Sequence, residues 1–269
     1  MMHGHPIPAA EDRTRFKAVA IEAARQAGGI LLDQVRSGFR IEHKQTIDLV
    51  TDADRASEQA IVERLRAAFP DHEILAEERG LTKARSSRYR WVIDPLDGTT
   101  NFAHGLPIYA VSIALECDGT IVLGVVLDPD RDELFIAEAG GGATLNGHPL
   151  RVSRTTALTD ALLVTGFAYD IRESGQNNLD NFARFSVRAQ GVRRLGAAAL
   201  DLCYIAAGRM DGFWEMKLYP WDMAAGALMV TEAGGRMSDF GGGVFSIYGK
   251  ELVASNGLIH DEMVDVLKK

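Results

Sequence analysis

Two aspartates and a glycine-threonine turn stand close together in the stretch Trp91 to Phe102, WVIDPLDGTTNF. Its first residues are typical of a buried strand, and Pro95, which has no N–H, should end that strand after Asp94. The carboxylates of Asp94 and Asp97 could bind a hard cation, and the N–H groups that start at Gly98 could bind a phosphate. The alternative is ordinary turn chemistry, because Asp-Pro and Asp-Gly pairs are common in loops.

Three further acids lie at the edges of apolar segments. Asp48 precedes an apolar pair, so its carboxylate should be half-buried and should need a partner, although a solvated loop acid is the alternative. Glu77 and Glu78 follow a short strand and should point to opposite faces; we expect Glu77 to point inward. Asp222 opens a helix, where a favourable interaction with the helix dipole would explain it equally well.

Brought together, these acids would repel one another, and burying an unpaired charge is costly. A divalent cation would remove the conflict. No histidine or cysteine accompanies the acids, and an all-oxygen ligand set favours Mg²⁺ or Mn²⁺ over zinc. The candidate ligands from this argument are Asp48, Glu77, Asp94, Asp97 and Asp222.

The composition is that of an ordinary globular protein. The chain has 269 residues, enough for one large domain or two closely packed halves. A net charge of −8 argues against nucleic acid as the main partner, because phosphate backbones are bound by clustered lysines and arginines. Neither a signal-peptide pattern nor a long uncharged apolar run is present, which predicts a cytoplasmic protein without membrane contact. Cys117 and Cys203 are expected to be buried, reduced thiols.

The elements that must position the acids differ between the two halves of the chain. Amphipathic helices are expected at 11–35 and 53–69, and a strand at 73–76. They precede an antiparallel meander at 108–116, 121–127 and 134–137. In the second half strands alternate with helices, as in a layered α/β structure. The strands are expected at 161–165, 211–216 and 252–255, and the helices at 179–189, 197–207, 223–233 and 258–267.

The sequence resembles the inositol monophosphatase family, which belongs with fructose-1,6-bisphosphatase among the lithium-sensitive, magnesium-dependent phosphatases. The matching segments are DLVTDAD (48–54), ILAEE (74–78), WVIDPLDGTTNF, GAAALDLCYIAAG (196–208) and PWDMAAGALMVTEAGG (220–235). They span most of the chain in the family's order. The resemblance implies an α+β or α/β fold, a layered α-β-α-β-α sandwich. A half at 1–150 would carry the metal motif and the antiparallel sheet, and an α/β half at 151–269 would share its core.

The resemblance also implies roles for individual residues. Glu77, Asp94 and the carbonyl of Leu96 would bind one metal ion, Asp94, Asp97 and Asp222 a second, and a third would bind more loosely near Glu77. Thr99, hydrogen-bonded to Asp48, would orient the attacking water, which makes Asp48, Glu77 and Thr99 the catalytic residues. The substrate would contact Leu96, Asp97, Gly98, Thr99, Gly196, Ala197, Ala198, Glu215 and Asp222. Arg193 is a further candidate, with a solvated arginine as the alternative.

The implied activity is the Mg²⁺-dependent hydrolysis of inositol monophosphate by a metal-activated water, in a homodimer. Fructose-1,6-bisphosphate and other phosphomonoesters remain alternative substrates. Branches of the family that act on phosphoadenosine phosphate or histidinol phosphate tend to carry lysine at the position of Thr100. The Thr100-Asn101 pair therefore resembles the inositol-phosphate branch more closely. An aspartyl-phosphate mechanism is disfavoured, because its acids are two residues apart and Asp94 and Asp97 are three apart. A regulatory protein that binds a partner is the alternative from another functional class.

Overall fold

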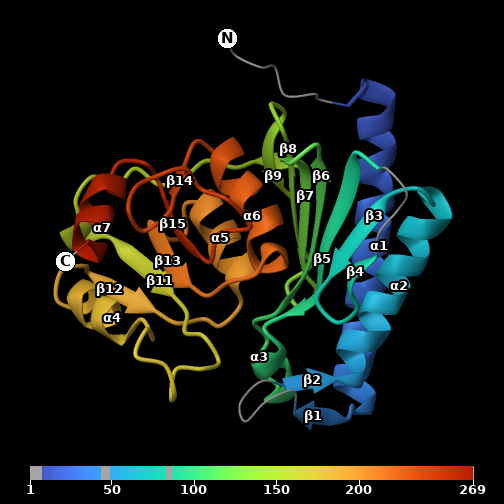
Figure 1. The fold of residues 1–269 in the computed structure, drawn as a ribbon, viewed down its shortest axis with the longest axis horizontal. Coiled ribbons are helices and arrows are strands. Elements are labelled where there is room, and N and C mark those ends of the chain that lie inside the picture. The colour runs from blue at the N-terminus through green and yellow to red at the C-terminus, as the bar shows by residue number, and fades with distance from the viewer. Residues whose placement is uncertain (1–7, 44–48, 83–86, 269) are drawn as a thin grey trace.

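The computed structural model describes residues 8–43, 49–82 and 87–268, and its elements form five layers (Figure 1). The outer layer consists of α1 (Ala10–Ser37) and α2 (Asp52–Ala68), which cover an eight-stranded sheet. Between this sheet and a five-stranded sheet lie α5 (Ala198–Ala206) and α6 (Pro220–Glu232). The far layer holds α4 (Leu179–Ser186) and α7 (His260–Leu267). The predicted α-β-α-β-α sandwich is confirmed.

The eight-stranded sheet has the order β10-β9-β8-β7-β6-β5-β3-β4. Its strands from β5 to β10 form an antiparallel meander, as predicted, whereas β3 pairs parallel to β5. The strands are β3 (Glu73–Ala76), β4 (Gly80–Thr82), β5 (Tyr89–Asp97), β6 (Ala110–Cys117), β7 (Thr120–Asp128), β8 (Glu133–Glu138), β9 (Gly142–Leu145) and β10 (His148–Pro149). A separate hairpin of β1 (Ile41–His43) and β2 (Leu49–Thr51) precedes α2.

The five-stranded sheet has the order β12-β11-β13-β15-β14. β11 pairs parallel with both β12 and β13, and β15 is antiparallel to its two neighbours. The strands are β11 (Leu162–Thr165), β12 (Gly191–Arg193), β13 (Gly212–Met216), β14 (Arg236–Ser238) and β15 (Glu251–Ser255), and a 3₁₀ turn at Leu158–Asp160 precedes them. Neither the edge strand β12 nor β14 was predicted from the sequence.

Strand β5 does not end where the proline predicted. Its ladder with β6 pairs Asp94 with Ser112, and pairing resumes at Asp97 with Ala110 after a register shift. Pro95 lies inside this irregular stretch, where a missing N–H interrupts no regular ladder. The prediction that the strand stops after Asp94 is therefore wrong, and both aspartates are held at the end of one continuous buried strand.

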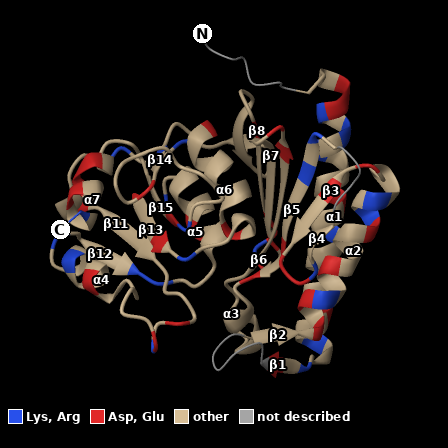
Figure 2. Ribbon diagram, viewed as in Figure 1, with Lys and Arg blue, Asp and Glu red and all other residues tan. Residues whose placement is uncertain are grey.

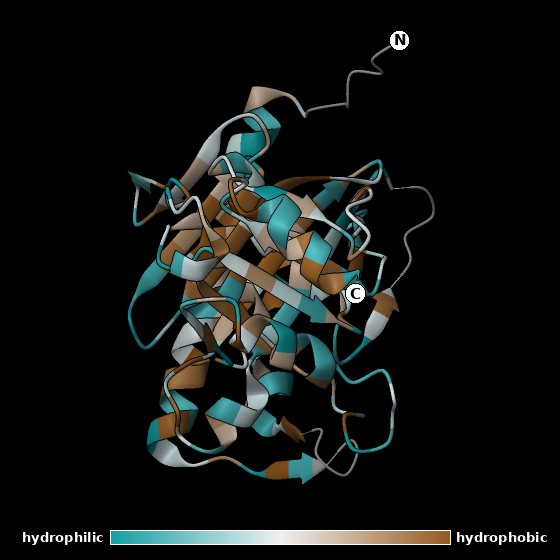
Figure 3. Cartoon of the chain, turned by 90° about the vertical axis from the view of Figure 1, so that its left-hand side faces the viewer, coloured by the Kyte–Doolittle hydropathy of each residue, from teal (hydrophilic) through white to brown (hydrophobic). Residues whose placement is uncertain are grey.

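The core is dense because small residues let the layers approach closely. α1 runs through Gly28, where a Cβ atom would lie 2.8 Å from Leu127 Cδ2, so glycine permits the contact with β7. Figure 3 shows the hydrophobic segments gathered in the interior, and Figure 2 shows acidic and basic residues interspersed along α1 and α2.

Across the described ranges, every helix is too short or too polar to span a lipid bilayer.

Candidate active site

The end of β5 turns its carboxylates toward backbone donors. Asp94 is buried, and its Oδ1 accepts a hydrogen bond from the N–H of Leu96 at 3.0 Å. Asp97 accepts two hydrogen bonds from the first turn of α5, from the N–H of Ala198 at 3.1 Å and of Ala199 at 2.8 Å. The positive end of α5 stabilises a negative charge at this position. The contact joins the large sheet to a helix about one hundred residues further along the chain.

Gly98, which follows Asp97, has a left-handed backbone conformation. Its φ is 91°, and a Cβ atom would lie 2.9 Å from the carbonyl oxygen of Ile108. A side chain is therefore excluded by both backbone strain and contact. Gly98 caps the short helix α3 (Thr99–Ala103), so that a helix does begin at the glycine-threonine turn.

Two further acids reach the same place from other elements. Asp222 stands at the third position of α6, after Pro220, and its Oδ2 accepts the N–H of Tyr219 at 2.8 Å. Glu77 begins the turn between β3 and β4, and its N–H donates to the carbonyl of Ile93 at 3.2 Å. α6 and β3 are separated by more than 140 residues of sequence, and the packed sheet and helix layers bring them together.

Most of the predicted site residues line one pocket of about 640 Å³. The ones brought together are Glu77, Asp94, Leu96, Asp97, Gly98, Thr99, Gly196, Ala197, Ala198, Glu215 and Asp222. Arg193 is not among the lining residues; its guanidinium donates to the carbonyl of Val192, and its neighbour Arg194 lines the pocket. Arg194, rather than the candidate Arg193, therefore lines the described pocket, since successive residues at a strand end point to opposite sides.

Thr99 has a carboxylate partner that the sequence reading missed. Its hydroxyl lies 3.0 Å from Oδ1 of Asp54 and 3.0 Å from the carbonyl of Leu96. Asp48, the predicted partner, lies outside the described residues. Asp54 is fixed by a capping box at the start of α2, in which its Oδ2 accepts the N–H of Thr51 at 2.7 Å. The Thr-x-x-Asp spacing of this capping box was the signal that could have singled out Asp54.

Burial and mutual repulsion disfavour the ionised form of these acids. The pKa of Asp94 is raised well above its usual value, first by burial and then by the charges of Glu77, Asp97 and Asp222. The pKa of Asp222 is likewise raised by burial, with Asp97 and Glu77 adding to it. Burial raises the pKa of Asp97 to about 6, against the opposing effect of its α5 hydrogen bonds. Such a cluster is stabilised by a cation.

Sequence and structure comparisons agree on the relatives of this chain. The model of the inositol monophosphatase family matches residues 12–268. The chain belongs to the inositol monophosphatase family. It is 44% identical to an inositol-1-monophosphatase of Mesorhizobium japonicum, over 96% of this chain and 97% of that protein. It is 48% identical to the Nus factor SuhB of Pseudomonas aeruginosa, over 88% of this chain and 90% of that protein.

Solved structures of the inositol monophosphatase family have the same fold. The structure of inositol monophosphatase from Anabaena (Nostoc) superposes with a TM-score of 0.88 at 43% identity, and covers 96% of each chain. The IMPase of Thermotoga maritima gives a TM-score of 0.85 at 38% identity, over 96% of this chain and 97% of that one. The chain is accordingly a phosphatase.

The donor set of this inositol monophosphatase family member fits a hard divalent cation. Glu77, Asp94, Asp97 and Asp222 offer only oxygen atoms, and the lining of the described pocket includes neither histidine nor cysteine. Within the described ranges the three aspartates form no ion pair with lysine or arginine. As the side chains stand, no three acids, histidines or cysteines of the described ranges are spaced to coordinate an ion. Each aspartate instead accepts a hydrogen bond from a backbone N–H.

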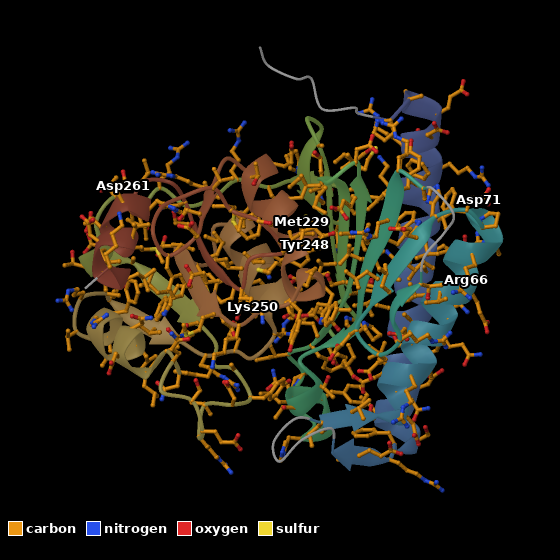
Figure 4. All side chains as sticks on the ribbon, in the orientation of Figure 1. Arg66, Asp71, Met229, Tyr248, Lys250 and Asp261 are labelled. Atoms are coloured by element: carbon orange, nitrogen blue, oxygen red, sulfur yellow. The ribbon has the colours of Figure 1, made fainter. Side chains whose placement is uncertain are left out.

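Other residues that line the pocket carry charges of both signs. Glu215, on β13, is buried, and burial raises its pKa to about 8 against the opposing effect of Arg194. Lys217 is ion-paired with Asp170 at 2.5 Å. Figure 4 shows Lys250, which also lines the pocket, in the central part of the molecule with Tyr248. The hydroxyl of Tyr248 donates to Glu116 of β6 at 2.6 Å, which ties the segment before β15 to the large sheet.

Proposed function

We propose that this phosphatase hydrolyses inositol monophosphate to inositol and inorganic phosphate in a Mg²⁺-dependent reaction. The observation that carries the proposal is the convergence of Glu77, Asp94, Asp97 and Asp222 on one pocket whose described lining contains neither histidine nor cysteine. A relative that is 44% identical is named inositol-1-monophosphatase, and inositol monophosphate is bound in the crystal structure of SaIMPase-II, which is 26% identical. Both support this substrate class.

The metal ligands in this proposal come from both halves of the chain. Glu77, Asp94 and the carbonyl of Leu96 would hold one Mg²⁺, and Asp94, Asp97 and Asp222 a second. Mn²⁺ could replace either, and a third ion would bind more loosely at Glu77. When bound, the ions supply a water of lowered pKa and neutralise charge on the phosphate and the leaving oxygen.

Thr99 and Asp54 would handle the proton of the attacking water. The Thr99 hydroxyl has one hydrogen, which it can donate to Oδ1 of Asp54, so that its oxygen lone pairs are free to accept an O–H from water. The pKa of Asp54 is raised, mainly by burial, which brings this carboxylate closer to the range of an effective general base. The contact with Thr99 supports a role for Asp54 in this step, and Asp48, to which the sequence resemblance gave that role, lies outside the described residues.

The remaining lining residues would bind the phosphate and the alcohol. The N–H groups of Gly98 and Thr99 would hold the phosphate oxygens at the start of α3. Glu215 would hydrogen-bond a hydroxyl group of the cyclitol, beside Gly196, Ala197 and Ala198. With its pKa at about 8, Glu215 carries its proton at neutral pH and can donate to such a hydroxyl. A polyol therefore fits these lining residues better than an apolar alcohol.

Phosphate release from inositol-1-phosphate tests the proposal, with Mg²⁺ and after chelation of the metal. The wild-type protein should release phosphate only with the metal, and Asp97→Asn should abolish the release. Fructose-1,6-bisphosphate and phosphoadenosine phosphate serve as competing substrates in the same assay. A higher kcat/KM for either of them would replace inositol phosphate in the proposal, and activity that persists in Asp97→Asn would refute the site itself.

A partner-binding role is the second candidate, because relatives at 41% to 48% identity carry the name Nus factor SuhB. The two roles can be distinguished by complementation in a cell that lacks the native gene. If the phosphatase reaction is what the cell requires, Asp97→Asn will fail to restore the lost phenotype. If a partner-binding role is required, the inactive variant will restore it.

We also propose a homodimer, which the family resemblance implies. Light scattering coupled to gel filtration should give twice the mass of the chain, 29.3 kDa, for the wild-type protein. A mass equal to one chain at micromolar concentration would overturn this part of the proposal.

A further inference from the structure

Helix α2 carries three buried polar side chains on one face, and each contacts a different segment of the active site. Asp54, Ser57 and Glu58 follow one another at spacings of three and one, which places them on the same side of the helix. All three are at most 1% exposed. Polar groups are rarely buried without a partner, so their contacts show what this face of α2 holds.

Ser57 holds the irregular end of β5. Its hydroxyl donates to the carbonyl of Pro95 at 2.7 Å. The ladder between β5 and β6 shifts register between Asp94 and Asp97, so that the carbonyl of Pro95 lies outside regular pairing. Ser57 supplies the missing donor between the two aspartates of the metal site. The serine hydroxyl therefore fixes the backbone from which both carboxylates project.

Glu58 holds the turn that presents Glu77. Its Oε2 accepts the N–H of Glu78 at 2.8 Å, and its Oε1 lies 3.1 Å from Nε of Arg79. Burial raises the pKa of Glu58, while the Glu78 N–H and Arg79 act in the opposite direction. The two contacts engage the residues that directly follow Glu77. A buried carboxylate with two donors from one turn fixes that turn in place.

We propose that Ser57 and Glu58 are positioning residues for the divalent-metal site, and that α2 sets the relative placement of Glu77, Asp94 and Asp97. Neither side chain lines the pocket, so neither touches the substrate. The inference rests on the proposed function in one respect, because it requires that these acids bind divalent ions. It goes beyond that function by locating part of the metal affinity in a helix outside the pocket.

Direct binding of Mg²⁺, measured by calorimetry without substrate, tests this proposal in Ser57→Ala and Glu58→Gln. Removing a side chain that orients metal ligands typically weakens metal binding about 10- to 100-fold. We expect a loss of on the order of tenfold in each variant, with kcat recovered at high Mg²⁺ concentration and KM for inositol phosphate little changed. Unfolding of the chelated proteins shows whether each variant is folded.

Glu63→Gln is the matched control, because Glu63 is an exposed glutamate on the same helix, bonded only to Gln59 among the described residues. Its Mg²⁺ affinity should change by less than about twofold. If Glu58→Gln does not fold, Ser57→Ala decides alone, since it removes a single oxygen. Wild-type affinity in a folded Ser57→Ala would overturn the proposal, and so would a lowered melting temperature with unchanged metal binding.

The same experiment separates this inference from the proposed function. If wild-type protein binds Mg²⁺ and releases phosphate while both variants bind Mg²⁺ equally well, only the positioning role of α2 fails. If the wild-type protein binds no divalent ion, the metal site fails, and the positioning role is overturned with it.

Discussion

The two walls of the pocket are built differently. The metal wall, defined as Glu77, Asp94, Asp97 and Asp222, contains only acids, and its three aspartates are held by backbone N–H groups. The alcohol wall, defined as Asp170, Arg194, Glu215 and Lys217, contains both charges and includes a side-chain ion pair. Backbone donors move only with the fold, whereas side-chain pairs can rearrange. We therefore expect the metal wall to determine the reaction and the alcohol wall to adapt to the leaving group.

The largest expected effect comes from the metal wall. Asp94→Asn keeps the shape of the side chain and an acceptor for the Leu96 N–H, but removes the charge that two metal ions would share. We expect kcat on inositol-1-phosphate to fall at least about a hundredfold, the scale for losing one preorganised electrostatic group. Initial rates at saturating Mg²⁺ measure this effect. A variant with more than a tenth of the wild-type kcat would contradict the role given to the metal wall.

We expect bound metal to stabilise the folded protein most at pH values at which these acids are ionised. The pKa of Asp97 is raised to about 6 and that of Glu215 to about 8, against unfolded values of about 4. The folded protein binds these protons more tightly than the unfolded chain, so the metal-free protein should lose stability as the pH rises from about 4 through these values.

Melting temperatures between pH 5 and pH 8 check this expectation, with and without Mg²⁺. At a concentration of 100 Kd the ion should add about 2.7 kcal/mol at pH 8. For a chain of this size that is roughly 5 to 10 °C. Equal melting temperatures with and without Mg²⁺ at pH 8 would mean that no cation neutralises the metal wall.

A change in the alcohol wall should act on the substrate and leave the metal in place. Glu215→Gln keeps a hydrogen-bonding side chain but cannot ionise. We expect kcat/KM for inositol phosphate to fall about tenfold, in the range for one hydrogen bond to a buried group, with unchanged Mg²⁺ affinity. The wild-type KM should also change as the pH passes about 8, where Glu215 loses its proton, and the variant should lack this step. A pH profile common to both proteins would remove Glu215 from substrate binding.

The smallest effect should come from the ion pair of Lys217 and Asp170. Lys217→Ala would release the loop that carries Asp170, and partly exposed pairs contribute at most about 1 kcal/mol. KM should therefore rise no more than about fivefold, without a change in kcat. Arg236→Ala, which breaks the pair with Asp261 far from the pocket lining, is the control and should leave KM unchanged. A fall in kcat for Lys217→Ala would mean that this pair also positions the reacting groups.

The metal wall could be predicted from the sequence better than the alcohol wall. Local motif chemistry restricts residues of the metal wall, whereas tertiary contacts place those of the alcohol wall. Asp94, Asp97 and Gly98 are adjacent in one motif at the end of a strand, where local chemistry already restricts their placement. Asp54 was missed because Asp48, Asp52 and Asp54 lie within seven residues, and the contact of Asp54 with Thr99 depends on the capping geometry of α2.

The alcohol wall depends on tertiary contacts that no local pattern encodes. Arg194 rather than Arg193 faces the pocket because of how the chain leaves β12. The pairing of Asp170 with Lys217 joins residues 47 positions apart. Pro95 shows the converse error, since a local rule ended a strand that tertiary packing, with Ser57 as its hydrogen-bond donor, carries through to Asp97.

Calorimetric titration of Mg²⁺ into wild-type protein and Asp222→Asn tests most directly whether acids from distant parts of the chain share the same ions. Asp222 is the member of the metal wall that comes from the second half of the chain. We expect the wild-type protein to bind at least two ions, and the variant to lose one of them or to bind it at least about tenfold more weakly. The same number of ions bound with the same affinity by both proteins would contradict this expectation.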